Sequence, residues 1–447
     1  MSEINLKKNI LMSGSFRIVI MIVSVLTGWV STRYLGVVLK GQYSYLMTSA
    51  SFIWMILGLG IYQSYPYILR KQAHRLEDMF QWSLLQYVFE LILFISLGLM
   101  FINNLITYTG IPFSPFLVVT YAVYIATSKY SMQMQMLYLG LDRIFQNSLM
   151  QFLRVFLSFL VIGCGWFFFR DADRLAYVIT AIVSADLFCV IYYTAALRCG
   201  NIFRKIDFKF ILNTYGMGIK IFASSLFILL LIRSDILLIK RFLAFRDVGI
   251  YSIAANIVDM LQLASNLVGS LLLVKLSDSD NEGENWIVMK KVLTSFIALL
   301  TLANLGFILF GKFLISTLYG IDFEPSYYVY LLLIPASFGL SFGSLFNTYL
   351  WSKGFPLISI LMPAIALLTN VLLNMFLIPL WGINGAAVST SIAYLLWFVL
   401  IVAYEQKVSG GRFIRNITPG FRDWAHLYQS AMATMNKIWR RSHVSVD

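Results

Sequence analysis

Long uninterrupted runs of apolar residues constrain this 447-residue chain more than any other feature of its sequence. An α-helix needs about 20 consecutive apolar residues to cross a hydrocarbon layer of about 30 Å. The composition agrees, because 59% of the residues are hydrophobic and only 12% are charged, against roughly a quarter charged in soluble domains. The runs lack the alternation of apolar and polar residues that marks a transmembrane β-barrel. We therefore expect an all-α polytopic membrane protein.

Twelve such runs can be counted, and each predicts one transmembrane helix. Lys and Arg concentrate in alternate links, and this bias places both termini in the cytoplasm. The outer links are short, and the first residues show no pattern of a removable signal peptide. The predicted spans are residues 10–32, 44–69, 81–102, 115–139, 147–169, 174–197, 215–239, 250–274, 286–310, 327–351, 357–379 and 385–404.

A sequence repeat indicates that the chain is built from two similar halves. Arg33-Tyr34-Leu35 with Gly41-Gln42-Tyr43-Ser44 returns 208 positions later as Arg241-Phe242-Leu243 with Gly249-Ile250-Tyr251-Ser252. Both copies follow the first predicted span of a half, so the halves are parallel repeats. This predicts an N-terminal six-helix lobe (1–197), a cytoplasmic linker (198–212), a C-terminal six-helix lobe (213–404) and a basic cytoplasmic tail (405–447).

The tail has the pattern of an amphipathic helix that lies on the inner leaflet of the membrane. Thr418 is the expected cap and Pro419 the expected first-turn residue. Basic residues along the tail would favour an anionic lipid surface. A partly ordered basic tail is the alternative. The apolar positions recur at spacings of three and four, at Phe421, Trp424, Tyr428, Ala431, Met435 and Ile438.

Ionisable residues inside the spans are the candidate functional groups. Such residues are costly in a membrane and normally face a cavity or a partner. The structural alternative for each is an internal ion pair, and for Arg154 and Lys220 also snorkelling to the headgroups. The cations are Arg17, Lys129, Arg154, Lys220 and Arg233, and the acids are Glu90, Asp186, Asp235 and Asp259.

Buried cations suggest an anionic substrate, most simply a lipid phosphate or pyrophosphate, because Arg and Lys bind phosphate oxygens strongly where water is excluded. We expect the five cations to bind this substrate. Asp235 and Asp259, ahead of Glu90 and Asp186, are the candidates for coupling transport to H⁺ or Na⁺.

Other chemistries have little support in the sequence. The three Cys (Cys164, Cys189, Cys199) lack the spacing of a metal site or a disulfide framework. Neither GxxxxGK[ST] nor HExxH occurs, and all three His lie outside the predicted spans. We therefore expect no enzyme, no metal and no cofactor. The net charge of +13 is explained by membrane topology, so nucleic acid is not an expected partner.

Several motifs together resemble the multidrug/oligosaccharidyl-lipid/polysaccharide exporter superfamily. Arg33-Tyr34-Leu35-Gly36 with Gly41-Gln42-Tyr43 is similar to a signature of its polysaccharide branch. Gly58-Leu59-Gly60, Asn370-x-x-x-Asn374 and Ile378-Pro379-Leu380-Trp381-Gly382 also fit. The resemblance covers about residues 5 to 405. Twelve spans argue against the peptidoglycan-precursor branch, which carries fourteen.

The resemblance implies a flippase for undecaprenyl-pyrophosphate-linked oligosaccharide, such as an O-antigen repeat unit of lipopolysaccharide. It also implies a V-shaped transporter with alternating access and a cationic central cavity, in the bacterial inner membrane. The expected partners are the lipid-linked oligosaccharide, membrane lipids and other polysaccharide-assembly membrane proteins. A cation-coupled multidrug exporter of the same superfamily is the first alternative. A membrane polysaccharide polymerase or ligase is a remote one, because short outer links carry little catalytic equipment.

Overall fold

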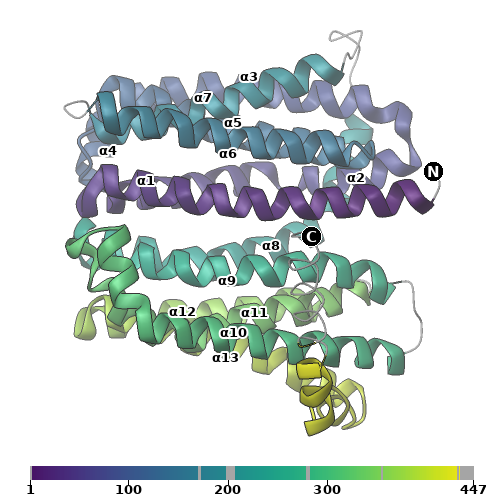
Figure 1. The fold of residues 1–447 in the computed structure, drawn as a ribbon. Helices are drawn as coiled ribbons and strands as arrows, with labels where there is room; N and C mark the ends of the chain where they lie inside the picture. Colours follow the sequence, from purple (N-terminus) through teal and green to yellow (C-terminus); the bar gives the residue numbers. More distant parts are fainter. Residues whose placement is uncertain are drawn as a thin grey trace, which may run out of the picture. The chain divides into compact units, whose positions relative to one another are not determined.

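The computed structural model describes residues 3–169, 173–197, 207–277, 282–353, 356–429 and 432, and these residues form helices joined by short turns. The expected all-α polytopic membrane fold is confirmed: ten of the described helices are long and apolar enough to cross a membrane. The helices (Figure 1) are α1 (Glu3–Gly58), α2 (Ile61–Lys71), η1 (Ala73–Arg75), α3 (Leu76–Met100), α4 (Ile102–Thr109), α5 (Pro115–Gly140), α6 (Ile144–Phe168), α7 (Arg174–Leu197), α8 (Phe208–Phe242), α9 (Phe245–Ser277), α10 (Glu282–Leu318), η2 (Ile321–Phe323), α11 (Ser326–Ser352), α12 (Ile358–Trp381), α13 (Ile383–Val408) and α14 (Phe413–Ile417).

The count of ten differs from the twelve predicted spans for two local reasons. The first predicted span and most of the second are joined in α1, which counts once. In addition, α5 is not among the ten, and it carries the polar residues Lys129, Gln133 and Gln135. The exact number of membrane crossings therefore stays a prediction.

The expected polar link between the first two spans is a kink in a continuous helix. Gly36 has φ 72° and ψ 176°, while the residues on either side of it stay helical. Only glycine adopts this left-handed φ without strain, so the signature glycine is what allows α1 to change direction. The residues from Arg33 to Ser44 are therefore helical except at this one position.

The second predicted span, 44–69, is not continuous. It is broken between α1 and α2, where Leu59 (φ 42°) and Gly60 (φ 70°) both have left-handed backbone. The Gly58-Leu59-Gly60 motif marks this break.

The start of α8 falls inside the predicted linker 198–212, which stays a prediction. α8 begins at Phe208, because the Asp207 side chain accepts a hydrogen bond from the backbone N–H of Phe210 (3.0 Å) and so caps the helix. Arg75 also donates to Asp207 (3.1 Å). The Phe210 N–H and the Arg75 guanidinium hold the pKa of the Asp207 carboxyl below its usual range. Residues 198–206 of the predicted linker lie outside the described residues.

By packing, the chain divides into two compact units. Unit 1 comprises Met1–Ser252 and Thr317–Phe323, and unit 2 comprises Ile253–Ser316 and Glu324–Asp447. This division differs from the predicted lobe boundary, because α8 packs against α1 and α2 within unit 1. The two six-helix lobes, which we inferred from the sequence repeat, stay a prediction.

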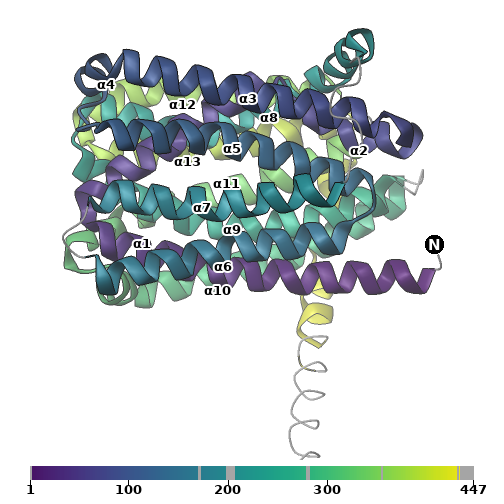
Figure 2. The same ribbon diagram turned by 90° about the horizontal axis from the view of Figure 1, so that it is seen from above.

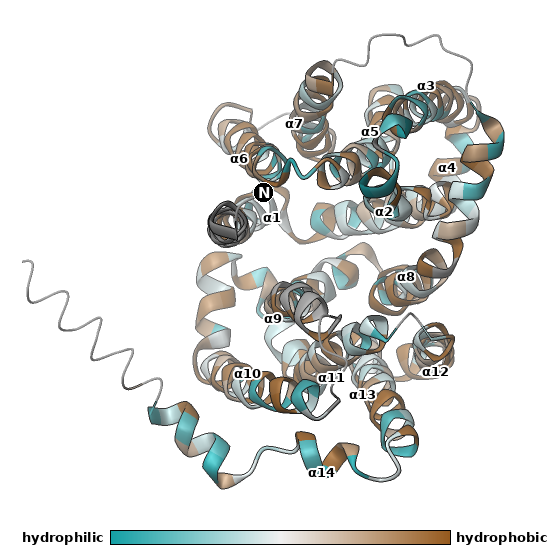
Figure 3. Cartoon of the chain, turned by 90° about the vertical axis from the view of Figure 1, so that its right-hand side faces the viewer, coloured by the Kyte–Doolittle hydropathy of each residue, from teal (hydrophilic) through white to brown (hydrophobic). Residues whose placement is uncertain are grey.

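In unit 1, α5 is the central helix. It contacts α1, α2, α3, α6 and α7, and the end-on view of Figure 3 shows it between α3 and α7. α6 and α7 both contact α5, and Figure 2 shows the axes of these three helices roughly aligned, without regard to chain direction. The core includes four fully buried tyrosines, namely Tyr65, Tyr130, Tyr138 and Tyr193.

The repeated signature forms a reciprocal close contact within unit 1. A Cβ on Gly41 would overlap the carbonyl oxygen of Phe245, and a Cβ on Gly249 would overlap that of Val37. Val37 and Phe245 are themselves separated by the 208-residue repeat distance, as are the two glycines. The equivalent segments of α1 and α9 therefore pack on each other in a symmetric way, and both glycines are needed for the backbones to approach.

In unit 2, α13 packs against both α11 and α12. Neutral groups make some of the polar contacts inside unit 2: Tyr330 donates to Asn304 Oδ1 (2.8 Å), and Asn304 donates to Ser337 (3.1 Å). The buried carboxylate of Glu405 pairs with Lys353 (2.8 Å). The Asn370-x-x-x-Asn374 motif is fully buried in α12, where Asn374 donates to Asn370 (2.9 Å). Lys290 and Lys291 lie inside the predicted ninth span and within α10, although the sequence analysis counted no span cations there.

The tail contains a helix over residues 421–429, but its start differs from the prediction. Thr418 is the C-cap of α14 rather than the N-cap of the next helix. The following helix begins at Phe421, where Asp423 accepts from the backbone N–H of Gly420 (2.8 Å). Three of the predicted apolar positions, Ala431, Met435 and Ile438, lie outside the described residues.

Candidate functional site

Two of the ion pairs among the described residues of unit 1 have a fully buried partner, and both lie on or against α5. The first joins Lys129 of α5 to Glu90 of α3, and the two residues are only 1% and 6% exposed. Both stand near the middle of their helices, so the pair is far from either helix end. The Lys129 side chain also approaches the position that a Cβ on Gly58 would occupy, next to the break between α1 and α2.

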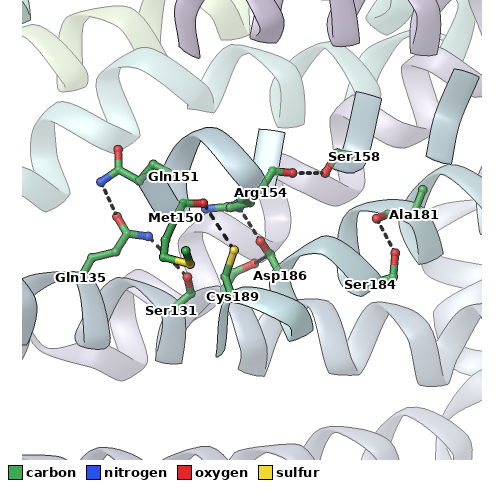
Figure 4. A network of polar contacts seen from close by, with 11 residues as sticks. Ser131, Gln135, Met150, Gln151, Arg154, Ser158, Ala181, Ser184, Asp186 and Cys189 are labelled. Carbon is green, nitrogen blue, oxygen red and sulfur yellow. Dashed lines mark hydrogen bonds and ion pairs between the residues drawn. The ribbon is translucent and has the colours of Figure 1, made fainter. Parts of the chain in front are cut away.

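The second ion pair joins Arg154 of α6 to Asp186 of α7 (Figure 4). Asp186 is fully buried, whereas the Arg154 side chain keeps 32% of its surface exposed. Ser128 of α5 donates to the other carboxylate oxygen of Asp186 (3.3 Å). The carboxylate is thus held from two helices, while about a third of the surface of the Arg154 side chain remains exposed.

Hydrogen-bonding side chains extend from these pairs along α5. Gln133 donates to Gln86 of α3 (2.9 Å), and Gln151 of α6 donates to Gln135 (3.2 Å). Figure 4 shows the second of these contacts beside the Arg154–Asp186 pair. Polar groups inside a membrane need such partners, because no water is present to replace them.

The tyrosine of the repeated signature donates to a carboxylate in one copy and lies near an ion pair in the other. Tyr251 donates to Asp235 Oδ2 (2.7 Å), and both residues are buried. Its repeat equivalent, Tyr43, lies within electrostatic range of the Arg154–Asp186 pair. This shared placement gives the tyrosine of the signature a physical role that the sequence pattern alone did not reveal.

The other predicted site residues lie on α1, α8 and α9, apart from the two ion pairs described above. Arg233 of α8 is partly buried in unit 1, two residues before Asp235. Asp259 of α9 is partly buried and belongs to unit 2. Arg17 and Lys220 lie on α1 and α8, but their side chains are outside the described residues.

Lys40 is a buried cation that the sequence analysis missed, because it was assigned to an outer link. It lies in α1 after the kink at Gly36, is 4% exposed, and stands over the ring of Tyr43 at 5.0 Å from the ring centroid. Among the described residues no carboxylate forms an ion pair with it. The signal that could have found it is its spacing from Tyr43, which places both on one side of a helix.

The ion pairs in the interior of unit 1 could bind a charged group. Within the described residues, no cluster of three His, Cys, Asp or Glu side chains could hold a metal ion. Cys189 is buried and contacts the Met150 carbonyl oxygen (3.4 Å), and Cys199 lies outside the described residues. In the interior of unit 1, Lys129 and Arg154 are each paired with a carboxylate in surroundings of low polarity.

Comparison with known families gives one match over more than half of the chain. The family described as "Polysaccharide biosynthesis protein" matches residues 6–274. A curated relative, the probable low-salt glycan biosynthesis flippase Agl15 of Haloferax volcanii, is 25% identical over 173 residues. That match covers 38% of this chain and 37% of the relative, so the chain matches little more than a third of the relative's length.

Solved structures of membrane transporters share the fold at low sequence identity. An inward-facing multidrug resistance MATE family transporter of the MOP superfamily gives a TM-score of 0.69 at 13% identity, over 90% of this chain and 99% of that one. The lipid II flippase MurJ, in an inward closed conformation, gives 0.66 at 13% identity, over 95% and 92%. A MOP superfamily transporter from Pyrococcus furiosus gives 0.63 at 12% identity, over 91% and 96%. The resemblance to this superfamily is therefore confirmed for the fold.

Proposed function

The chain belongs to the polysaccharide biosynthesis protein family, and we propose that it is a flippase for a lipid-linked oligosaccharide. The substrate would be an undecaprenyl-pyrophosphate-linked repeat unit, such as an O-antigen unit, moved from the cytoplasmic to the outer leaflet of a bacterial inner membrane by alternating access. The match to a probable glycan flippase supports this substrate class. The protein is a multi-pass membrane protein with the fold of known transporters.

The observation that carries the proposal is the Arg154–Asp186 pair, which places a partly exposed arginine side chain inside a membrane helix bundle. A bare Arg at this depth would be costly, and Asp186 neutralises it while the site is empty. A pyrophosphate offers oxygens that a guanidinium binds through two parallel hydrogen bonds. The substrate would therefore compete with Asp186 for Arg154.

The same competition suggests how an ion could be coupled to transport. If the substrate takes over Arg154, the carboxylate of Asp186 stays buried without its counter-charge. An uncompensated buried carboxylate is strongly unfavourable, so Asp186 would then bind a proton or Na⁺. Glu90 would lose its counter-charge in the same way if the substrate bound Lys129. Asp235 has the Tyr251 hydroxyl as a partner.

The remaining predicted cations, Arg17, Lys220 and Arg233, complete the proposed substrate-binding set. We add Lys40 to it, because a buried ammonium with no carboxylate partner among the described residues is suited to an anionic headgroup. Lys40 and Arg154 both lie near the signature tyrosine, Tyr43.

A multidrug exporter of the same fold is the second candidate, and three of the four span acids, Glu90, Asp186 and Asp235, speak against it. Cationic drugs would need accessible carboxylates. Glu90 and Asp186 are each neutralised by a basic residue, and Asp235 is 2% exposed.

Surface glycan in a strain that lacks the gene tests the proposal. Arg154→Gln should lower surface glycan by about ten- to a hundredfold, as expected for losing a charge-assisted hydrogen bond of about 1.5 to 3 kcal/mol. The double variant Arg154→Gln/Asp186→Asn keeps the site neutral and should stay folded but inactive. Arg17→Ala and Arg233→Ala should also abolish glycan at normal protein levels in the membrane.

Lys312→Gln is the matched control, because this lysine pairs with Glu324 at 53% exposure and lies outside the proposed set. Normal surface glycan in the double variant would remove Arg154 from the site. Drug sensitivity of the deletion strain, with its glycan intact, would favour the exporter instead.

A further inference from the structure

Unit 2 contains a rigid elbow between α13 and α14, at the end of α13 that we expect to face the cytoplasm. Gly410 (φ 63°) and Gly411 (φ 85°) turn the chain. The Gln406 side chain fixes the turn from both sides: its Nε2 donates to the Gly411 carbonyl (2.7 Å), and its Oε1 accepts from the Ile414 N–H (2.8 Å). The short helix that follows is thus held in one position relative to α13.

An aromatic anchor secures α14 to the rest of unit 2. Phe413 is 0% exposed and stacks on Tyr349, with ring centroids 6.0 Å apart. Trp286 contacts Phe413 edge-on (6.4 Å) and donates to the Tyr349 hydroxyl (3.1 Å). The elbow is therefore part of the packed structure and not a loose continuation of the chain.

An apolar groove of about 470 Å³ lies between the last turns of α13 and Ile414 of α14. Its apolar walls are Phe398, Val399, Val402, Ala403 and Ile414. Gln406 and Lys407 form its polar end. This part of α13 belongs to a candidate membrane span that ends at Val408. We therefore expect the groove at hydrocarbon depth and its polar end at the level of the headgroups.

Positive charge surrounds the polar end of the groove. Lys407, Arg412 and Arg415 are all exposed, and none of them forms an ion pair with a carboxylate of the described residues. Arg412 donates only to the Ser409 carbonyl in the turn (3.0 Å). The helix that follows exposes Phe421 (89%) and Tyr428 (66%), the residue types that sit at membrane–water interfaces. Figure 3 shows apolar and polar residues alternating along this part of the chain.

We propose that this groove binds one anionic phospholipid of the inner leaflet. An acyl chain would lie along Val399, Val402 and Ala403, and the phosphate would contact Lys407 and Arg415. Both parts of the fit are needed, because the groove alone would accept any acyl chain, and the cations select an acidic headgroup. The site is separate from the charges in the interior of unit 1, so it does not depend on the proposed transport reaction.

Lipid binding to the purified full-length protein tests the proposal. Delipidated protein in a neutral detergent would be titrated with phosphatidylglycerol or phosphatidylcholine, and bound lipid counted by native mass spectrometry. We expect phosphatidylglycerol to bind about tenfold more tightly, given the additive attraction of basic residues for acidic lipid. Lys407→Gln/Arg415→Gln should remove this preference and leave phosphatidylcholine binding unchanged. Lys291→Gln is the charge control, an exposed lysine near the cytoplasmic end of α10.

Filling the groove tests the apolar part. Ala403→Phe should weaken the binding of both lipids, with Ala403→Leu as a milder variant if the first does not fold, and Ile392→Phe elsewhere on α13 should change neither. Equal affinity for the two lipids in the unaltered protein would overturn the proposal. So would undiminished binding in a folded groove-filled variant, or a dimer that becomes monomeric when the groove is filled, since a second copy would then be the occupant.

Discussion

Asp186 neutralises Arg154 in the interior of unit 1, and this single carboxylate controls whether the arginine is tolerated there. Asp186→Asn would leave a buried guanidinium without a counter-charge. We predict a loss of about 3–5 kcal/mol of folding free energy, as for other buried pairs that lose one partner. Arg154→Gln/Asp186→Asn should recover most of it. Thermal unfolding in detergent micelles of both single variants and the double variant would measure the coupling, and a coupling energy near zero would contradict the ion pair.

Gly41 and Gly249 make a second prediction at the residue scale. Gly41→Ala places a methyl group against the carbonyl of Phe245, and Gly249→Ala places one against that of Val37. Each should lower the unfolding temperature, because backbone atoms cannot move aside as a flexible side chain can. Gly28→Ala, in the same helix with no atom near the added methyl, is the control and should be neutral or stabilising by up to about 1 kcal/mol. Equal behaviour of Gly28→Ala and Gly41→Ala would argue against the close crossing.

The sequence predicted which residues form the candidate site better than it predicted which residues contact one another there. The sequence placed Glu90, Lys129, Arg154 and Asp186 inside predicted spans, because an apolar run around a charge is visible in one dimension, whereas Lys290 and Lys291 were not counted. It did not predict that Lys129 meets Glu90 or that Arg154 meets Asp186, since these partners lie on different helices and their meeting depends on how the helices rotate. Lys40 was missed because the segment around it was expected to be a link, and its burial follows from a kink at a single glycine.

At the scale of elements, most helices could be predicted closely and their ends less well. α7 and α5 match their predicted spans almost residue for residue, because Pro115 and Arg174 mark clear starts. α8 extends upstream of its predicted start because Asp207 caps it. The start was predicted from hydropathy, which does not detect a polar cap residue in a basic linker. The break at Leu59–Gly60 interrupts a run that is apolar on both sides, so hydropathy alone could not detect it.

The tail helix gives a prediction about pH. The Lys290 ammonium (2.6 Å away) and the Gly420 N–H hold the pKa of the Asp423 carboxyl below its usual range. A lowered pKa in the folded state stabilises the docked helix at pH values above the unfolded pKa of about 3.9. This stabilisation is lost as the pH falls through the lower folded value. A spin label at Tyr428→Cys should therefore stay ordered from pH 8 to about pH 5 and become mobile below about pH 4.

Two variants accompany that titration. Asp423→Asn removes the charge and should leave the label mobile at every pH, whereas Asp322→Asn, at an exposed site near the end of α10, should have no effect. A label whose mobility changes with pH in the same way in Asp423→Asn would mean that another group controls the tail.

On the scale of the whole molecule, the sequence repeat and the packing describe different divisions of one chain. The repeat separates the halves between α7 and α8, whereas α8 and the start of α9 pack with α1 and α2 in unit 1. The reciprocal contact between Gly41 and Gly249 reconciles the two, because equivalent segments of the two repeats meet inside one unit. Membership of the polysaccharide biosynthesis protein family and the transporter fold then make flipping of a lipid-linked glycan the proposed task of the assembled protein.

Reconstituted flipping is the most direct test of that proposal. Purified protein in vesicles would be given a fluorescent pyrophosphate-linked oligosaccharide lipid in one leaflet, and its arrival in the other leaflet followed by quenching from outside. We predict translocation that depends on the protein, that is lost in Arg154→Gln/Asp186→Asn, and that is unaffected in Lys312→Gln. Translocation no faster than in protein-free vesicles, from protein shown to be folded, or full activity in the double variant, would contradict transport through the charged interior of unit 1.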